Sequence, residues 1–385
     1  MKYLKLILLF FGALCNTFGQ TPFDLRQGSH FTIEEAKIEH IRLASLYSNK
    51  EEWLSRAAQI KRGILDGAEI DTLKRNQRVK ATIHSKKVFE GYSVENVFFE
   101  AFEGVYVTGN LYKPTIIKGK VPGILCPHGH GTSPRLETYT QQRCATLARM
   151  GAVVFAYDML GFGDMTQADH KIRNVLKAQL IMGTRSLDFL SELPYIDQSQ
   201  IAMTGESGGG TQTFLLSALD DRIKVSVPVV MVSSYFFGGC LCESGMPIHI
   251  REDHKTSNVE IAACMAPNPM LLISDGDDWT KHNPEVAFPH IKRIYSFFNA
   301  EENIKNIHLP NEKHDYGPSK RQAAYAFLAT HLDLKELMDK ETGLFDESSN
   351  TIQKQKGLRV FNFQNPRPKN IVKGNRAVIK AIDDY

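Results

Sequence analysis

The chain has 385 residues, and its 46 lysines and arginines nearly balance its 43 aspartates and glutamates, which leaves a formal net charge of +3. Apolar residues make up 42% and charged residues 23%, as in ordinary globular proteins. This composition excludes a disordered chain, a collagen-like chain and a protein that binds nucleic acid through its net charge. The length allows roughly one to three domains.

The first 19 residues are typical of a secretory signal peptide. Lys2 and Lys5 give a short basic start, an apolar run follows over residues 6–15, and Gly19 offers a small side chain for cleavage. We therefore expect the mature chain to be periplasmic or extracellular, with an uncleaved N-terminal anchor as the alternative. No later stretch approaches about 20 apolar residues, so we expect no membrane span in the mature chain.

Five cysteines follow this segment, an odd number that leaves at least one thiol unpaired within the chain. So few cysteines in so long a chain do not form a disulfide scaffold. Three of them allow one bridge, but their spacing does not determine the pairing: Cys240, Cys242 and Cys264. No CxxC pair is present, so the cysteines do not predict a zinc site.

Two segments of different pattern come first along the chain. Apolar residues recur at roughly helical spacing over residues 32–79, which predicts a helical extension within 20–80. Between residues 81 and 114, apolar residues stand among turn residues and predict two or three antiparallel strands.

From residue 121 onward, strands and helices alternate. The expected strands are 121–126, 152–157, 201–204, 225–232, 270–274 and 304–309, and the expected helices are 136–150, 173–193, a helix ending near 219, 284–298 and 321–337. This alternation predicts an α/β fold, in which a mostly parallel sheet has helices on both faces. We place this domain at 81–340, with an irregular insert at 233–266 and a polar tail at 341–385 that wraps around the domain or frays.

The sharpest motif is GESGG at residues 205–209, which follows a short apolar strand and precedes a helical pattern. A serine on such a tight strand-to-helix turn projects above the sheet, and glycines on both sides avoid steric clashes. The free N–H groups of the next helix can stabilise an anion that forms near Ser207. No lysine follows the glycines, so a phosphate loop fits poorly. Ser207 is therefore the candidate nucleophile.

A nucleophilic serine needs a base and an orienting acid, which are expected on loops after later strands. His314 lies in the loop after the strand 304–309, whereas His308 lies within that strand and His331 within a helix. Three aspartates follow the strand 270–274; we favour the third, Asp278, over Asp277 and Asp275. The order Ser207, Asp278, His314 is the order of an α/β-hydrolase triad.

A second glycine-containing loop, 127–131 (PHGHG), follows the strand 121–126. We expect the backbone N–H groups of His130 and Gly208 to form an oxyanion hole, each donor contributing roughly 3 kcal/mol. His128 and His130 are also a possible pair of metal ligands, but no third ligand is near them in the sequence, so we predict no metal.

These residues resemble the α/β-hydrolase superfamily, in particular its secreted serine esterases of the acetyl-xylan-esterase-like and dienelactone-hydrolase-like kinds. The matching motifs lie at 127–131, 158–163 (DMLGFG), 205–209, 278–280 and 314–316. The resemblance implies an α/β-hydrolase fold, an ester substrate, and Ser207, His314 and Asp278 as nucleophile, base and acid. The insert has no counterpart in a well-known substrate pocket.

The sequence thus predicts a secreted serine esterase that needs no cofactor and hydrolyses an acetyl ester on a carbohydrate through an acyl-enzyme on Ser207. Trp279 and Tyr316 adjoin the predicted triad in sequence and are candidates for stacking on a sugar ring. A serine peptidase on the same fold and a catalytically inactive, ligand-binding hydrolase fold are the alternatives. The acyl group, the alcohol and the oligomeric state are not determined.

Overall fold

The computed structural model describes residues 28–385, so the predicted signal peptide lies outside the described residues. After the short strand β1 (Gly28–Ser29) come two helices, α1 (Ile33–Ala44) and α2 (Lys50–Gly67). Thr32 begins α1 with a capping box: its hydroxyl accepts the Glu35 N–H, and the Glu35 carboxylate accepts the Thr32 N–H. The predicted helical segment therefore contains two helices, while its last part, after α2, is not helical.

Nine strands form the main sheet: β2 (Thr82–Val88), β3 (Tyr92–Phe102), β4 (Val105–Pro114), β5 (Val121–Cys126), β6 (Val153–Tyr157), β7 (Ile196–Glu206), β8 (Val225–Val229), β10 (Met270–Asp275) and β11 (Ile304–Leu309). Their order across the sheet is β11-β10-β8-β7-β5-β6-β4-β3-β2. The strands from β6 to β11 in this order pair in parallel. The strands β2, β3 and β4 are antiparallel, and β4 joins the parallel part antiparallel to β6. The predicted mostly parallel sheet is confirmed.

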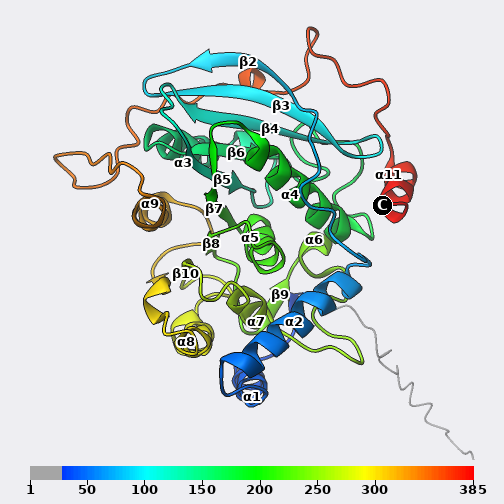
Figure 1. Ribbon diagram of the computed structural model, residues 1–385, viewed down its shortest axis with the longest axis vertical. Coiled ribbons are helices and arrows are strands. Elements are labelled where there is room, and N and C mark those ends of the chain that lie inside the picture. Colours follow the sequence, from blue (N-terminus) through cyan, green and yellow to red (C-terminus); the bar gives the residue numbers. More distant parts are fainter. Residues whose placement is uncertain (1–27) are drawn as a thin grey trace, which may run out of the picture.

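Helices cover both faces of this sheet (Figure 1). One face carries α3 (Thr138–Arg149) and α9 (Pro318–Leu332). The other carries α4 (Val175–Glu192), α5 (Gly208–Leu219), α7 (Asn258–Ala263) and α8 (Phe288–Ser296), with α2 packed against α7. Each layer encloses its own apolar core, because the strands between them are buried on both faces.

Several boundaries differ from the sequence prediction. The strand β7 begins at Ile196 rather than at residue 201. The helix α9 ends at Leu332 because Asp333 adopts a left-handed conformation with φ 51°. The predicted helix 284–298 is a π-helical turn, η2 (Asn283–Ala287), followed by α8. Two short 3₁₀ turns, η1 (Pro134–Leu136) and η3 (Glu301–Asn303), complete this part of the fold.

The insert at 233–266 is more regular than expected. It contains β9 (Phe236–Gly238), which pairs with β1, the short helix α6 (Leu241–Ser244), and α7. Side chains hold its loops together: the Asn258 amide donates to the Phe236 carbonyl at 3.1 Å, and the Glu243 carboxylate accepts the N–H groups of Gly239 and Cys240. The Asn258 contact joins residues far apart in the segment, and no periodic pattern reveals either contact.

The C-terminal tail wraps around the domain. It contains α10 (Gln355–Leu358) and α11 (Asn375–Asp383), and the side chains of Leu358 and Val360 are buried. The buried Arg135 guanidinium donates to the Leu358 carbonyl, and the Val360 N–H donates to Asp164. Within the described residues, no helix has the length and apolar character needed to cross a membrane.

Candidate active site

Ser207 occupies the sharp turn between β7 and α5, as the sequence predicts. Its backbone has φ 55° and ψ −122°, a strained conformation for a residue with a side chain. The flanking glycines are required because the loop after β5 lies against the turn. A Cβ on Gly205 would lie 2.6 Å from the Pro127 carbonyl oxygen, and one on Gly209 would lie 2.7 Å from the same atom. The Ser207 hydroxyl forms no hydrogen bond within the described part of the chain.

A histidine and a carboxylate lie at the same edge of the sheet. Asp278 follows β10 and His314 follows β11, and the His314 Nδ1–H donates to the Asp278 Oδ2 at 2.7 Å. The other Asp278 oxygen accepts the N–H and the hydroxyl of Thr280 at 2.6 and 2.5 Å. With both oxygens engaged, the carboxylate fixes the imidazole ring and leaves its Nε2 available as a base.

The two other aspartates of this loop have different roles. Asp275 is buried and pairs with Lys320 at 3.2 Å. Burial and the nearby Asp278 carboxylate raise the pKa of Asp275. The Asp277 N–H donates to the Asp275 side chain at 3.2 Å, as in an Asx turn. Of the three, Asp278 is the one bonded to His314.

The other two histidines considered as bases lie where the sequence places them. His308 lies in β11, and its Nδ1 is 2.9 Å from the Ser274 hydroxyl. His331 lies in the last turn of α9. Neither side chain is bonded to Asp278, which leaves His314 as the candidate base.

The loop that carries His130 lies directly beside Ser207. A Cβ added to Gly129 would lie 3.2 Å from the Ser207 Cβ, and one added to Gly208 would lie 2.9 Å from the His130 ring. The Gly129 N–H donates to the Glu206 carboxylate at 2.9 Å, which anchors this loop to the serine turn. The predicted oxyanion donors, the N–H groups of His130 and Gly208, thus belong to two segments in contact, one of them the N-terminus of α5.

A buried ion pair that the sequence does not reveal supports the turn that carries Ser207. The Arg143 guanidinium on α3 donates to Glu206 at 3.1 Å, and both side chains are almost completely buried. The only signal in the sequence is a carboxylate at the end of an apolar strand. Glu206 therefore links α3, the loop 127–131 and the turn that carries Ser207.

The two predicted sugar-stacking residues have different surroundings. Tyr316 is 1% exposed, its hydroxyl bonds to Thr204 at 2.7 Å, and the Arg143 guanidinium lies 4.2 Å from its ring. Tyr316 is thus a core residue, and its assignment to substrate stacking is wrong. Trp279 is half-buried at the site, with its ring 4.6 Å from that of His314 and stacked on Phe236 at 4.1 Å.

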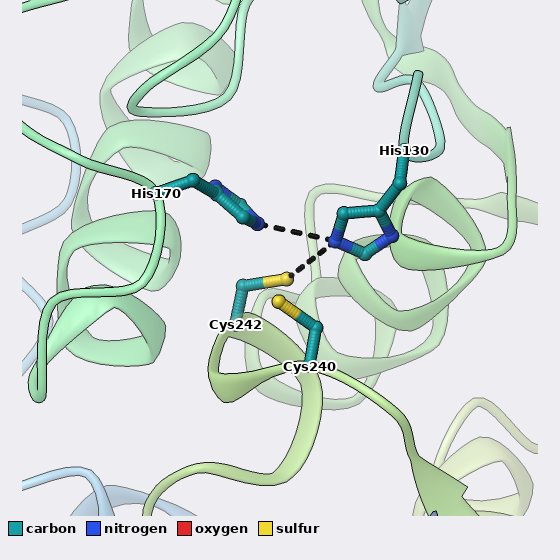
Figure 2. Close-up of side chains that lie close together, drawn as sticks. All are labelled: His130, His170, Cys240 and Cys242. Atoms are coloured by element: carbon teal, nitrogen blue, oxygen red, sulfur yellow. Dashed lines mark hydrogen bonds between the residues drawn. The ribbon is translucent and has the colours of Figure 1, made fainter.

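The two histidines of the loop 127–131 also differ. His128 is buried; its Nδ1–H donates to the Gly129 carbonyl, and its Nε2 accepts the Met159 N–H. His130 instead points toward three metal-ligand side chains, His170, Cys240 and Cys242 (Figure 2). The expectation that His130 has no further ligand nearby is wrong, because the insert folds back onto this loop. All five described cysteines are free thiols.

A serine on a strained strand-to-helix turn, a histidine held by a carboxylate, and this strand order define an α/β-hydrolase. The family model described as "Acetyl xylan esterase (AXE1)" matches residues 66–237. Methylesterase BT1017, a solved structure, is 38% identical with a TM-score of 0.85, and the match covers 93% of this chain and 80% of that chain. The chain therefore belongs to the family of serine carboxylic ester hydrolases related to acetyl xylan esterases.

Two further comparisons concern the fold and a part of the chain. The fold of a CE15 glucuronoyl esterase from Teredinibacter turnerae T7901 is similar, with a TM-score of 0.58 at 11% identity, over 80% of this chain and 96% of that one. "Putative hydrolase YtaP" from Bacillus subtilis (strain 168) is 32% identical over 134 residues, which cover 30% of this chain. That match spans 45% of the curated relative.

Proposed function

We propose that the protein hydrolyses a carboxylic ester on a carbohydrate through an acyl-enzyme on Ser207. The observation that carries this proposal is the Asp278–His314 hydrogen bond of 2.7 Å at the sheet edge to which the strained Ser207 turn belongs. Both Ser207 and His314 are partly exposed, so a substrate can reach them from solvent.

The proposed mechanism follows from these positions. The Nε2 of His314 takes the Ser207 proton while the serine oxygen attacks the ester carbonyl, and Asp278 stabilises the resulting imidazolium. The N–H groups of Gly208 and His130 receive the negative charge that develops on the carbonyl oxygen. His314 then returns the proton to the leaving alcohol, and a water molecule repeats the cycle on the acyl-enzyme. The strained turn holds the serine ready before substrate binds.

Two carbohydrate esters fit this reaction. An acetyl ester is the substrate class expected from the sequence and from the family model. The methylesterase relative matches nearly the whole chain, which favours a methyl ester; on a carbohydrate, a methyl ester requires a sugar carboxyl group, as in a uronic acid. We therefore propose a uronic acid methyl ester as the preferred substrate. The N-terminal signal-peptide pattern supports placing this activity outside the cytoplasm.

The test compares methanol release from a methyl-esterified polyuronide with acetate release from an acetylated xylan, using the wild-type protein and Ser207→Ala. We expect methanol release to dominate and the variant to lose at least about 10³-fold in rate. Release of acetate without methanol would show that the substrate is an acetyl ester and not a methyl ester. If neither ester is cleaved, or if the variant is as active as the wild type, the serine esterase proposal fails.

A further inference from the structure

Four metal-ligand side chains from three separate segments converge beside the proposed active site (Figure 2). His130 comes from the loop after β5, and His170 from the loop between β6 and α4. Cys240 and Cys242 come from the start of α6 in the insert. One nitrogen or sulfur of each residue lies within 4.8 Å of the others. We propose that these four side chains bind one zinc ion in a tetrahedral N₂S₂ site.

Two of the donor spacings are close to those of that geometry, within a cluster whose ligand atoms all lie within 4.8 Å of one another. The Nε2 atoms of His130 and His170 are 3.1 Å apart, and the Cys242 Sγ lies 3.3 Å from the His130 Nε2. In a tetrahedral zinc site with Zn–N bonds of about 2.0–2.1 Å, two nitrogen ligands are about 3.3 Å apart, and Zn–S bonds of about 2.3 Å give slightly longer N–S separations. Small movements of the side chains would therefore admit the ion.

Neighbouring groups orient the ligands as zinc requires. The Nδ1–H of His170 donates to the Leu160 carbonyl at 2.7 Å, which leaves a lone pair on Nε2 toward the cluster. The Nδ1 of His130 lies 3.8 Å from the Glu243 carboxylate, which favours a proton on that nitrogen and again leaves Nε2 for the metal. The second Glu243 oxygen fixes the Cys240 turn by accepting the N–H groups of Gly239 and Cys240.

The charges in the cluster also favour a divalent cation. Cysteine binds zinc as the thiolate, so binding would release the thiol protons of Cys240 and Cys242 to solvent, and two thiolates would neutralise the ion. Sulfur and imidazole ligands select zinc over magnesium and calcium.

The ion would act as a structural brace. Four protein ligands leave no open coordination position, as is typical of structural rather than catalytic zinc. The site would join the insert to the loop that carries His130, whose ring lies against Gly208. If the proposed esterase mechanism holds, the ion would therefore position one side of the oxyanion hole. The binding of zinc itself does not depend on that mechanism.

The first test measures zinc directly. Wild-type protein and Ser207→Ala are dialysed against zinc with a reducing agent and then against metal-free buffer, and metal content is measured by mass spectrometry. We expect about one zinc ion per chain in both, since the site does not need the serine. Cys240→Ser and His170→Asn should bind zinc at least about 100-fold more weakly. Cys264→Ser, which alters a buried thiol just after α7 and outside the cluster, should bind like the wild type.

A second measurement on the wild type alone guards against variants that do not fold. Cobalt(II) should produce the intense visible absorption of a tetrahedral site together with thiolate-to-cobalt charge transfer, and zinc should protect Cys240 and Cys242 from alkylation. A wild-type protein without bound zinc, cobalt absorption or thiol protection would overturn the proposal, as would an equal loss of zinc in Cys264→Ser. Peptide masses showing a Cys240–Cys242 disulfide that persists under these reducing conditions would also overturn it.

Discussion

Asp277 and Asp278 are neighbours in the sequence with opposite surroundings. Asp278 is 9% exposed and gives one oxygen to His314 and the other to Thr280, whereas Asp277 is exposed. Asp278, and not Asp277, can therefore hold the His314 imidazole in the tautomer that accepts the serine proton.

We therefore expect Asp278→Asn to lower kcat by about 10³- to 10⁴-fold, since the amide no longer favours the required tautomer. Asp277→Asn is the matched control and should stay within about 3-fold of wild type, because an exposed substitution away from the reacting atoms changes little. Hydrolysis of a nitrophenyl ester measures both. A severe loss in Asp277→Asn with normal activity in Asp278→Asn would reverse the assignment.

Tyr316 and Trp279 offer a second comparison at this scale. Tyr316→Phe removes a buried hydroxyl bonded to Thr204, so we expect the free energy of unfolding to fall by about 1 kcal/mol with no change in KM. Trp279→Ala should instead raise KM for a carbohydrate ester, because its ring adjoins His314. Urea unfolding and steady-state kinetics distinguish the two effects. A raised KM in Tyr316→Phe would show that Tyr316 contributes to substrate binding after all.

The sequence indicates candidate site residues where the local chemistry is distinctive. Ser207 stands between glycines after an apolar strand, and His314 lies in a loop after another. The Arg143–Glu206 ion pair and the cluster around His170 could not be predicted, because each joins segments whose proximity is a product of the fold. Tyr316 was misassigned because adjacency in sequence does not show which way a side chain points.

At the scale of elements, α2 is attached to the insert by a nearly buried ion pair. The Arg56 guanidinium donates twice to Glu260 on α7, at 3.0 and 2.5 Å, and the Glu260 side chain is 0% exposed. On the same helix, Arg62 pairs with Asp66, but both of these side chains are largely exposed. The two pairs test how burial changes the contribution of an ion pair.

We expect Arg56→Ala to reduce the free energy of unfolding by about 3 kcal/mol, because it leaves the Glu260 carboxylate buried without its partner. Arg62→Ala should change it by less than about 1 kcal/mol, since water screens an exposed pair. Denaturant unfolding of the two variants beside wild type provides the comparison. Equal effects would show that α2 is not held to α7 through Arg56.

Elements were predictable where apolar periodicity is strong. The strand 304–309 has the predicted bounds, and the helices α3 and α4 and the end of α5 lie close to the expected positions. The insert was expected to be irregular because its sequence has no periodic apolar pattern. Its order depends instead on hydrogen bonds such as that from Asn258 to Phe236, which leave no such pattern. The end of α9 was missed because it depends on a left-handed Asp333, a residue type that helices also tolerate.

On the scale of the whole molecule, several histidines that are not part of the candidate site are buried. Burial lowers the pKa of His40 and of His249 to about 4, and lowers that of His290 as well. The Nδ1 atoms of His40 and His290 lie 3.4 Å apart, and the His249 Nε2 lies 2.7 Å from the Asn258 amide oxygen. The unfolded chain binds protons at these residues below about pH 6.5, whereas the folded protein excludes them from His40 and His249 until near pH 4.

Stability should therefore fall as the pH drops from about 6.5 toward 4, by at most about 1.4 kcal/mol per pH unit for each such histidine. His249→Gln removes the titrating ring but still offers an N–H donor to Asn258. It should reduce the slope of stability against pH by up to about 1.4 kcal/mol per pH unit. Urea midpoints at several pH values between 5 and 7.5 measure it for the wild type and the variant. A wild-type protein that becomes more stable on acidification, or an unchanged slope in the variant, would contradict this account.

We propose that the Ser207 hydroxyl is activated for acylation. The most direct measurement is intact-mass analysis after treatment with a fluorophosphonate, followed by peptide mapping. We predict one adduct per chain, located on Ser207, absent from Ser207→Ala and formed much more slowly in Asp278→Asn. Well-folded wild-type protein that remains unlabelled, or is labelled at another serine, would contradict the claim.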